Sequence, residues 1–227
     1  MVYITGDIHG SLEPIYELCN KYNPTAEDIV VILGDVGVNY YGGRRDKRLK
    51  HRMNNLGCTF FCIHGNHENR PQNILSYKEK QWNCGRVLYE KDFPNILFPK
   101  DGDIFNIESK RCLVIGGAYS VDKYYRLIYG GMWWSDEQPS EITKAYVEAQ
   151  VAGNDIDVVF SHTCPFKYIP TECFLPNIDQ SEVDDSTERW LDAIENRIDY
   201  QAWYVGHWHT NKHVDKIHFL LHDVETL

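Results

Sequence analysis

Five short polar segments carry the residues of this sequence that are best suited to chemistry. Each segment follows an apolar run with the length of a β-strand. The candidate ligands in these segments are Asp7, His9, Asp35, Asn66, His162, His207 and His209, and the third segment also carries His67. Oxygen and imidazole donors of this kind bind divalent ions such as Mn²⁺, Fe²⁺ and Zn²⁺. The pattern therefore predicts metal chemistry.

Each segment taken alone has an ordinary explanation. Turns are rich in aspartate, and a single histidine such as His162 is more often hydrogen-bonded in a core. Recurrence at five strand ends is not explained in this way. Because ligands collect beyond the carboxyl ends of strands in an α/β sheet, we expect the five segments to form one site. His207 and His209 are two residues apart in a segment expected to be extended, which favours ligation of two different metals.

The apolar pattern predicts the elements that position these segments. Helices are expected from a cap at Ser11 and over residues 44–56, 137–152 and 184–197. Strands and a final hairpin are expected at Val2–Thr5, Ile29–Leu33, Thr59–Ile63, Arg86–Tyr89, Ile96–Phe98, Ile104–Ile107, Cys112–Ile115, Val158–Phe160, Trp203–Val205 and Lys212–Leu221. This order predicts an α/β protein with two packed sheets flanked by helices, as a single domain over residues 1–227.

The composition limits which cellular compartment and which binding partners we expect for the protein. The formal net charge is -10, which disfavours nucleic acid. A basic cluster between Arg44 and Arg52 is either a solvated helix face or a patch for anions. Seven cysteines, an odd number without close pairs, favour a reducing compartment. The sequence shows no signal peptide and no membrane span, so we expect a cytoplasmic protein.

The five segments together resemble the calcineurin-like metallophosphoesterase superfamily. They read Gly6-Asp7-Ile8-His9-Gly10, Gly34-Asp35, Gly65-Asn66-His67-Glu68, Ser161-His162 and Gly206-His207-Trp208-His209. The first and third look most like the phosphoprotein phosphatase branch. The resemblance implies a two-sheet β-sandwich flanked by helices, with a dinuclear metal centre of Mn, Fe or Zn.

The resemblance also assigns roles by motif position. Asp7, His9 and His209 would hold one metal, and Asn66, His162 and His207 the other. Asp35 would bridge both ions, and His67 would be the general acid that protonates the leaving oxygen. A pair of ions about 3.5–4 Å apart lowers the pKa of a bridging water and neutralises charge on the phosphate.

Three positions depart from the phosphoprotein phosphatase pattern. Val38 and Asn39 stand where that branch usually has Asp and Arg, and His64 stands where it has a second Arg. The Asp that orients the catalytic histidine and two phosphate-clamping arginines are therefore missing. Arginines in or beside expected loops are the candidates to replace the clamp: Arg126 first, then Arg44, Arg45 and Arg70. Arg126 belongs to an aromatic-rich segment, residues 116–134, that would either wall a substrate pocket or pack as core.

These features favour hydrolysis of phosphate esters. Monoesters, including phosphoproteins, are slightly preferred on motif style, while the missing arginines favour diesters or nucleotides because a monoester dianion needs more cationic clamping. The substrate is thus a phosphorylated small molecule, nucleotide or phosphoprotein. The alternative of another class is a non-catalytic metal-binding module that docks a partner. The presence of His67 argues against it, because a metal site does not need that residue.

Overall fold

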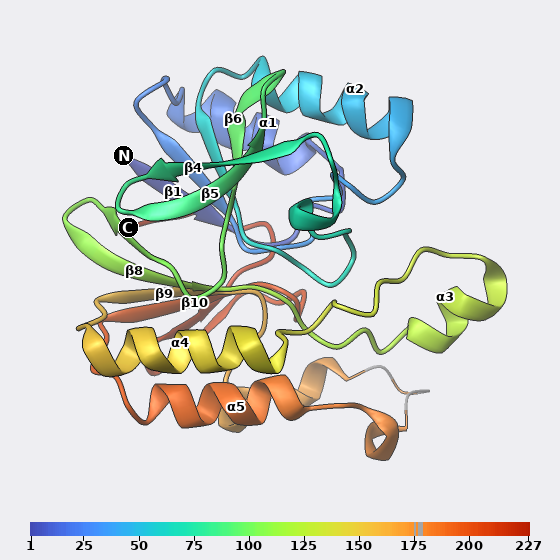
Figure 1. The fold of residues 1–227 in the computed structure, drawn as a ribbon, viewed down its shortest axis with the longest axis vertical. Coiled ribbons are helices and arrows are strands. Elements are labelled where there is room, and N and C mark those ends of the chain that lie inside the picture. The colour runs from blue at the N-terminus through green and yellow to red at the C-terminus, as the bar shows by residue number, and fades with distance from the viewer. Residues whose placement is uncertain (175, 177–178) are drawn as a thin grey trace.

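The computed structural model describes residues 1–174, 176 and 179–227, and its described strands form two packed sheets (Figure 1). One sheet has the order β13-β1-β2-β3-β6-β5-β4, and the other has the order β11-β12-β10-β9-β8-β7. The strands of the first sheet are β1 (Val2–Thr5), β2 (Ile29–Ile32), β3 (Thr59–Cys62), β4 (Tyr77–Trp82), β5 (Gly85–Glu90), β6 (Phe93–Pro99) and β13 (Glu225–Thr226). Those of the second are β7 (Ile104–Ile107), β8 (Lys110–Ile115), β9 (Val158–Ser161), β10 (Ala202–Val205), β11 (Lys212–Val214) and β12 (Ile217–Phe219).

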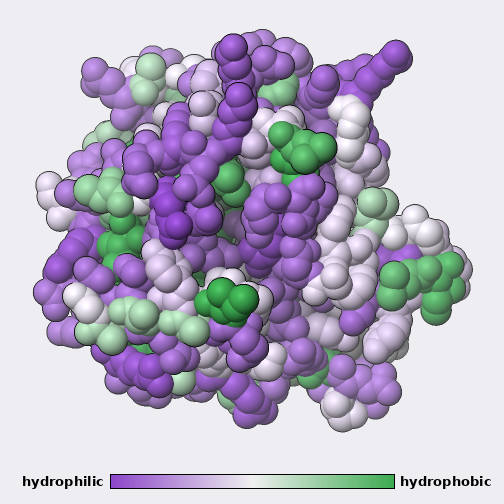
Figure 2. Space-filling view, in the orientation of Figure 1, coloured by the Kyte–Doolittle hydropathy of each residue, from purple (hydrophilic) through white to green (hydrophobic). Residues whose placement is uncertain are grey.

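Helices cover the outer face of each sheet, as Figure 1 shows. The first sheet is covered by α1 (Glu13–Tyr22) and α2 (Gly43–Asn54), and the second by α4 (Glu141–Gly153) and α5 (Ser186–Glu195). Helix α3 (Lys123–Tyr129) stands away from this body, and its surface is hydrophobic (Figure 2). Short 3₁₀ turns occur at Pro71–Asn73, Phe166–Tyr168, Thr171–Cys173 and Gln180–Glu182.

Alternate residues of the buried strands serve different cores. Val31 and Leu33 of the second strand segment face the space between the sheets, where they join residues such as Phe160. Val30 and Ile32 point the other way, toward α1 and α2. Because both faces are covered, these strands read as continuous apolar runs. The predicted two-sheet α/β architecture is therefore confirmed.

The register of the parallel strands brings their carboxyl ends to one level. Strands β1, β2 and β3 are parallel, and their last residues Thr5, Ile32 and Cys62 are paired in register. Strands β8, β9 and β10 are likewise parallel, with Ile115, Ser161 and Val205 in register. Within each sheet, the loops that follow these three ends consequently start side by side.

Several local predictions were wrong. Ser11 does not cap α1: the helix begins at Glu13 after Leu12, which makes no side-chain cap. Helix α4 begins at Glu141, later than expected, because Ser140 caps it by accepting a hydrogen bond from the Thr143 amide. Strand β4 was missed because its side chains are polar and mostly exposed, and α3 was missed because its apolar residues face solvent.

Two expectations about the environment concern cysteines and membranes. All seven cysteines lie in the described part of the chain and are free thiols. Among the described residues, every helix is too short or too polar to cross a membrane.

Candidate metal centre and active site

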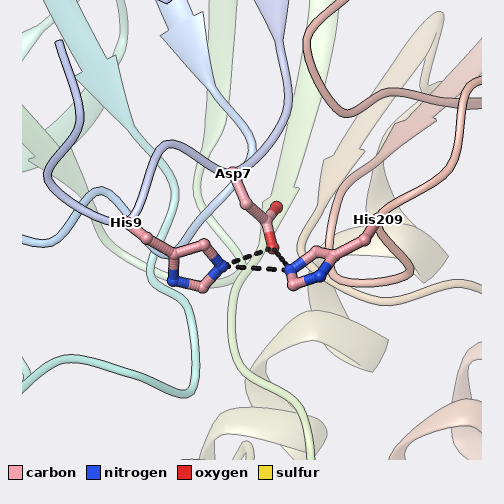
Figure 3. Close-up of side chains that lie close together, drawn as sticks. All are labelled: Asp7, His9 and His209. Carbon is pink, nitrogen blue, oxygen red and sulfur yellow. Dashed lines mark hydrogen bonds and ion pairs between the residues drawn. The ribbon is translucent and has the colours of Figure 1, made fainter. Parts of the chain in front are cut away.

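The five polar segments meet at the carboxyl ends of the parallel strands. Asp7, His9 and His209 form one group, drawn in Figure 3. His209 Nε2 lies 3.3 Å from Asp7 Oδ2 and 3.0 Å from His9 Nε2. Residues 200 positions apart in the chain thus present a carboxylate and two imidazoles to one point.

Asn66, His162 and His207 form a second group beside the first. His162 Nε2 and His207 Nδ1 approach Asn66 Oδ1 at 2.8 and 3.1 Å. His162 and Asn66 are buried, whereas His207 is partly exposed. The structure therefore separates His207 from His209 and places each with a different group.

Asp35 lies between the two groups. Its Oδ2 is 4.0 Å from His9 Nδ1 on one side and 3.7 Å from His162 Nε2 on the other. The carboxylate is 1% exposed, so its charge is costly unless opposite charges compensate it. This position suits an oxygen donor that is shared between two cations.

Both buried carboxylates are held in the same way by a glycine loop. The amide of His207 donates to Asp7 Oδ1 at 2.9 Å, and the amide of His67 donates to Asp35 Oδ1 at 2.8 Å. A Cβ on Gly206 or Gly65 would overlap those same oxygens. Only glycine allows the backbone to come so close. One oxygen of each carboxylate is thereby fixed, and the other is left facing the histidines.

A backbone carbonyl fixes the orientation of His162. Its Nδ1–H donates a hydrogen bond to the Leu33 carbonyl at 2.7 Å. The lone pair of Nε2 is therefore directed toward the centre. Such a contact selects the tautomer and the ring orientation of a ligating histidine. Leu33 comes from the end of the run that contains β2, so the neighbouring sheet orients this ligand.

A polar network orients Asn66 from the other side. Its Nδ2 donates to Ser120 Oγ at 2.9 Å, and Ser120 Oγ donates to Glu137. Glu137 also accepts the indole hydrogen of Trp133 at 2.7 Å. The amide oxygen of Asn66 is therefore directed at the histidines. Sequence reasoning missed Ser120 and Glu137, because nothing in their spacing relates them to Asn66.

The backbone is strained at four of the ligand positions. His9, Asp35, His207 and His209 all have positive φ angles, between 45° and 62°. Such conformations cost non-glycine residues on the order of 1–3 kcal/mol each and concentrate at functional sites. The expectation that the last segment is extended was wrong: the Trp208 amide bonds to the Gly206 carbonyl, which forms a tight turn around His207.

Burial and mutual proximity shift the pKa values of the centre. Burial raises the pKa of Asp7, but His162, His209 and His9 outweigh it and lower that pKa to about 2. The hydrogen bond to Asp7 raises the pKa of His209. Burial lowers the pKa of His207 well below its ordinary value, which keeps its imidazole neutral. Ionised carboxylates and neutral imidazoles are the forms that bind metal.

His67 lies at the rim of the centre. Its ring contacts the His9 ring edge-on at 5.4 Å between centroids. Burial lowers the pKa of His67, the charge of Asp35 raises it, and Arg126 and Asp122 act on it in opposite directions. Asp122, which precedes α3, and Arg126, within α3, are therefore the charged pair beside the expected general acid.

The four candidate arginines occupy different places. Arg126 is 5% exposed and donates to Asp122 Oδ1 at 2.9 Å and to the Met132 carbonyl at 3.0 Å. Arg70 is buried in a separate cavity, where it pairs with Asp101 at 2.6 Å. Arg44 and Arg45 are exposed at the start of α2, with Arg45 over the Tyr41 ring. Of these, only Arg126 acts electrostatically on His67.

The three departing positions have local partners of their own. Val38 is buried in the core beneath α1 and α2. Asn39 is buried and hydrogen-bonded to the Tyr77 hydroxyl at 2.9 Å. His64 is buried and bonds the Glu68 carbonyl at 3.1 Å, and its pKa is lowered well below the ordinary value, chiefly by burial. These residues support the loops around the centre.

A cavity of about 900 Å³ opens directly over His9, Asp35, Asn66 and His67. Its remaining walls come from residues 119–122, from described residues within 166–174 and 180–188, and from the turn at 207–209. The aliphatic and aromatic lining residues are Tyr119, Val121, Phe166, Ile169, Phe174, Val183 and Trp208, and the acidic ones are Asp122, Asp184, Asp185 and Glu188. The segment after β8 therefore does wall a pocket at Tyr119–Asp122, while Trp133 bonds to Glu137.

The donor set fits divalent metal. In Asp7, His9 and His209, and again in Asp7, Asp35 and His162, one ligand atom per residue lies within 4.8 Å of the others. Carboxylate, amide and imidazole donors match the preferences of Mn, Fe and Zn ions. Buried ionised carboxylates also require a compensating positive charge. The arrangement suits a divalent metal site that adjoins an open cavity.

Comparison with known proteins agrees with this geometry. The family model described as calcineurin-like phosphoesterase matches residues 1–211, so the chain belongs to that family. The protein is accordingly a metal-binding phosphoester hydrolase. One solved crystal structure superposes with a TM-score of 0.52 at 12% identity, covering 96% of this chain and 88% of that one, which shows the fold alone. No curated protein matches the chain significantly.

Proposed function

We propose that the protein is a phosphomonoesterase with a dinuclear centre. Asp7, His9 and His209 would hold one ion, and Asn66, His162 and His207 the other. The observation that carries the proposal is the placement of Asp35, whose Oδ2 lies between the two groups at 4.0 and 3.7 Å from their histidines. Bound Mn, Fe or Zn ions would supply an activated water and neutralise charge on the phosphate.

The side chains around the ions divide the remaining work. The buried network of Ser120 and Glu137 keeps the Asn66 oxygen turned inward. His67 lies in the cavity wall, where it would donate a proton to the departing oxygen. Burial lowers the pKa of His67 overall, while the charges of Asp35 and Asp122 act against this and favour its protonated form. Asp122 could thus serve in place of the aspartate that is missing at Val38.

The cavity walls suggest the class of ester. Aromatic and aliphatic side chains line the space beyond the centre, together with four carboxylates. Apolar walls bind apolar groups, and carboxylates repel additional phosphates. The proposed substrate is therefore a phosphate ester of a bulky apolar or aromatic alcohol, which includes a phosphorylated aromatic side chain, rather than a polyphosphate nucleotide.

Phosphodiesterase activity is the second candidate, and one observation favours it. Lys167 is the one lysine or arginine among the described residues that line the cavity, and its Nζ is paired with Glu195 at 2.7 Å. A monoester dianion would meet few fixed cations besides the metals. A diester carries a single negative charge and needs less clamping.

A substrate panel with added Mn²⁺ tests these alternatives. It should contain p-nitrophenyl phosphate, bis-p-nitrophenyl phosphate, methyl phosphate, ATP and a phosphotyrosine peptide. We expect kcat/KM to be highest for the aryl monoesters and lowest for ATP. A preference for the bis-ester would show that the protein is a phosphodiesterase and not a phosphomonoesterase. Lack of turnover on the whole panel, with the metals bound, would instead favour a docking module.

A further inference from the structure

A second cluster of histidine and carboxylate side chains lies at the edges of the two sheets, outside the active-site cavity. His213 on β11 and His218 on β12 are directly opposed across the strand pair, with ring centroids 4.2 Å apart. Glu225 on β13, in the other sheet, reaches both. Its Oε1 is 2.7 Å from His213 Nε2, and its Oε2 is 2.7 Å from His218 Nδ1.

The donor atoms of this cluster converge on one point. A ligand atom from each of the three residues lies within 4.8 Å of the others, as in the family's own metal centre. Donors around a tetrahedral Zn²⁺ with bonds near 2.0–2.1 Å are roughly 3.3 Å apart. Opening the two 2.7 Å contacts by roughly half an ångström would therefore admit an ion.

The chemistry of the cluster selects the kind of ion. Two imidazole nitrogens and one carboxylate favour Zn²⁺, Co²⁺, Ni²⁺ or Cu²⁺ over Mg²⁺ and Ca²⁺, which prefer oxygen. The His213 side chain is 58% exposed, so water can complete the coordination. The Tyr204 ring packs against His218 at 4.7 Å and holds that ring in place.

We propose that His213, His218 and Glu225 form an additional divalent metal site that links the edges of the two sheets. An ion there would tie β13 of one sheet to the β11–β12 hairpin of the other. None of the three residues lines the active-site cavity, so the ion would not touch substrate.

Counting bound Zn²⁺ in matched variants tests this site. Purified full-length protein is stripped with chelator, equilibrated with Zn²⁺ and measured for zinc per chain and for its unfolding temperature. His213→Ala and Glu225→Gln should each bind one ion fewer than the wild type, or bind it at least tenfold more weakly. Zn²⁺ should raise their unfolding temperatures less than it raises that of the wild type. Hydrolysis of p-nitrophenyl phosphate should be unchanged.

His51→Ala is the matched control, because His51 is an exposed histidine on α2 that packs against Phe93. It should retain the zinc content of the wild type. Glu225→Gln keeps the size of the side chain, so a normal circular dichroism spectrum would show that lost zinc is not lost folding. Equal zinc content in the wild type and in both folded cluster variants would overturn the proposal, whatever the activity of the family centre.

Discussion

The ligand side of the cavity comes from strand ends, whereas the facing wall comes from residues 119–122 and from described residues within 166–174 and 180–188, which lie in loops, short turns and the start of α5. On the ligand side, Asp7, Asp35, Asn66 and His162 are buried, and each one is hydrogen-bonded to the backbone or to another residue of the centre. On the wall, aromatic and acidic side chains face the open cavity.

This difference assigns the chemical step to the ligand side of the cavity and the selection of substrate to the facing wall. Four of the candidate ligand positions have strained φ angles, and Gly206 and Gly65 lie too close to Asp7 and Asp35 to accept a Cβ, so the backbone tightly constrains this side. Wall positions make fewer such demands, since loops accept changes that strands do not. Changes on the ligand side should therefore alter metal content and kcat, whereas changes in the wall should alter substrate preference or stability.

The largest expected effect is that of Asp35→Ala. Removing the shared carboxylate should weaken both family metal sites and lower kcat/KM on p-nitrophenyl phosphate by about 10³-fold or more, since metal charge stabilisation is worth several kcal/mol. Metal analysis and kinetics would measure both losses. If this variant retains full metal content, Asp35 is not the bridging ligand.

His67→Ala should keep the metals and lose catalysis. We expect kcat to fall by about 10²-fold or more for an alkyl phosphate, because an unassisted alkoxide leaves slowly. The fall should be smaller for p-nitrophenyl phosphate, whose leaving group needs no proton. Losses of equal size with the two esters would contradict a general-acid role.

Arg126→Ala tests whether this arginine, which acts electrostatically on His67 from beside the cavity wall, supplies the missing clamp. If this arginine stabilises the phosphate, its loss should cost about 2–4 kcal/mol in kcat/KM on a monoester, and less on a diester. Arg126→Lys distinguishes charge from the guanidinium geometry and guards against misfolding. Arg44→Ala, Arg45→Ala and Arg70→Ala serve as comparisons. Monoester activity within about threefold in all four alanine variants would exclude a relocated arginine clamp.

Glu188, a residue of the wall, should make the free energy of unfolding of the protein depend on pH. Burial raises the pKa of this carboxyl to about 7, while Thr163 Oγ1 donates to it at 2.8 Å. The folded state thus holds a proton that the unfolded chain releases above about 4.5. Stability should fall as pH rises from about 4.5 to 7 and then level off.

Glu188→Gln should remove that fall and raise the free energy of unfolding above pH 7 by up to about 3 kcal/mol. Denaturant unfolding at several pH values measures it. The amide oxygen of glutamine can still accept from Thr163. Glu17→Gln, at an exposed position of α1, is the control with the same charge change. Parallel pH profiles for the Glu188 variant and the wild type would refute the assignment.

Phe174→Ala should have the smallest effect. It removes an aromatic wall residue whose ring lies 6.3 Å from that of Trp208, and should raise KM for bulky aryl phosphates by about fivefold, or 1 kcal/mol. Its kcat/KM for methyl phosphate should stay the same. A uniform change for large and small esters would show that this wall does not select the alcohol.

The sequence by itself was sufficient for the sheet cores and for the list of ligand-type residues. Continuous apolar runs such as Ile29–Leu33 have few ways to be buried other than as central strands, and the polar segments follow directly from their ends. Strand β4 and helix α3 were not predicted because neither buries a periodic apolar face. The start of α1 was misplaced because a serine near a helix end need not accept a hydrogen bond.

Only the tertiary structure decided how those residues are combined. The contacts of Asn66 with Ser120, of His162 with the Leu33 carbonyl and of His213 with Glu225 join segments that no local pattern relates. Asp122 and Arg126 are only four residues apart in the chain, but their placement beside His67 is again a result of the tertiary structure. Local sequence sets burial and periodicity, which act over a few residues, whereas hydrogen bonds and charges act between whichever elements the sheet order brings together.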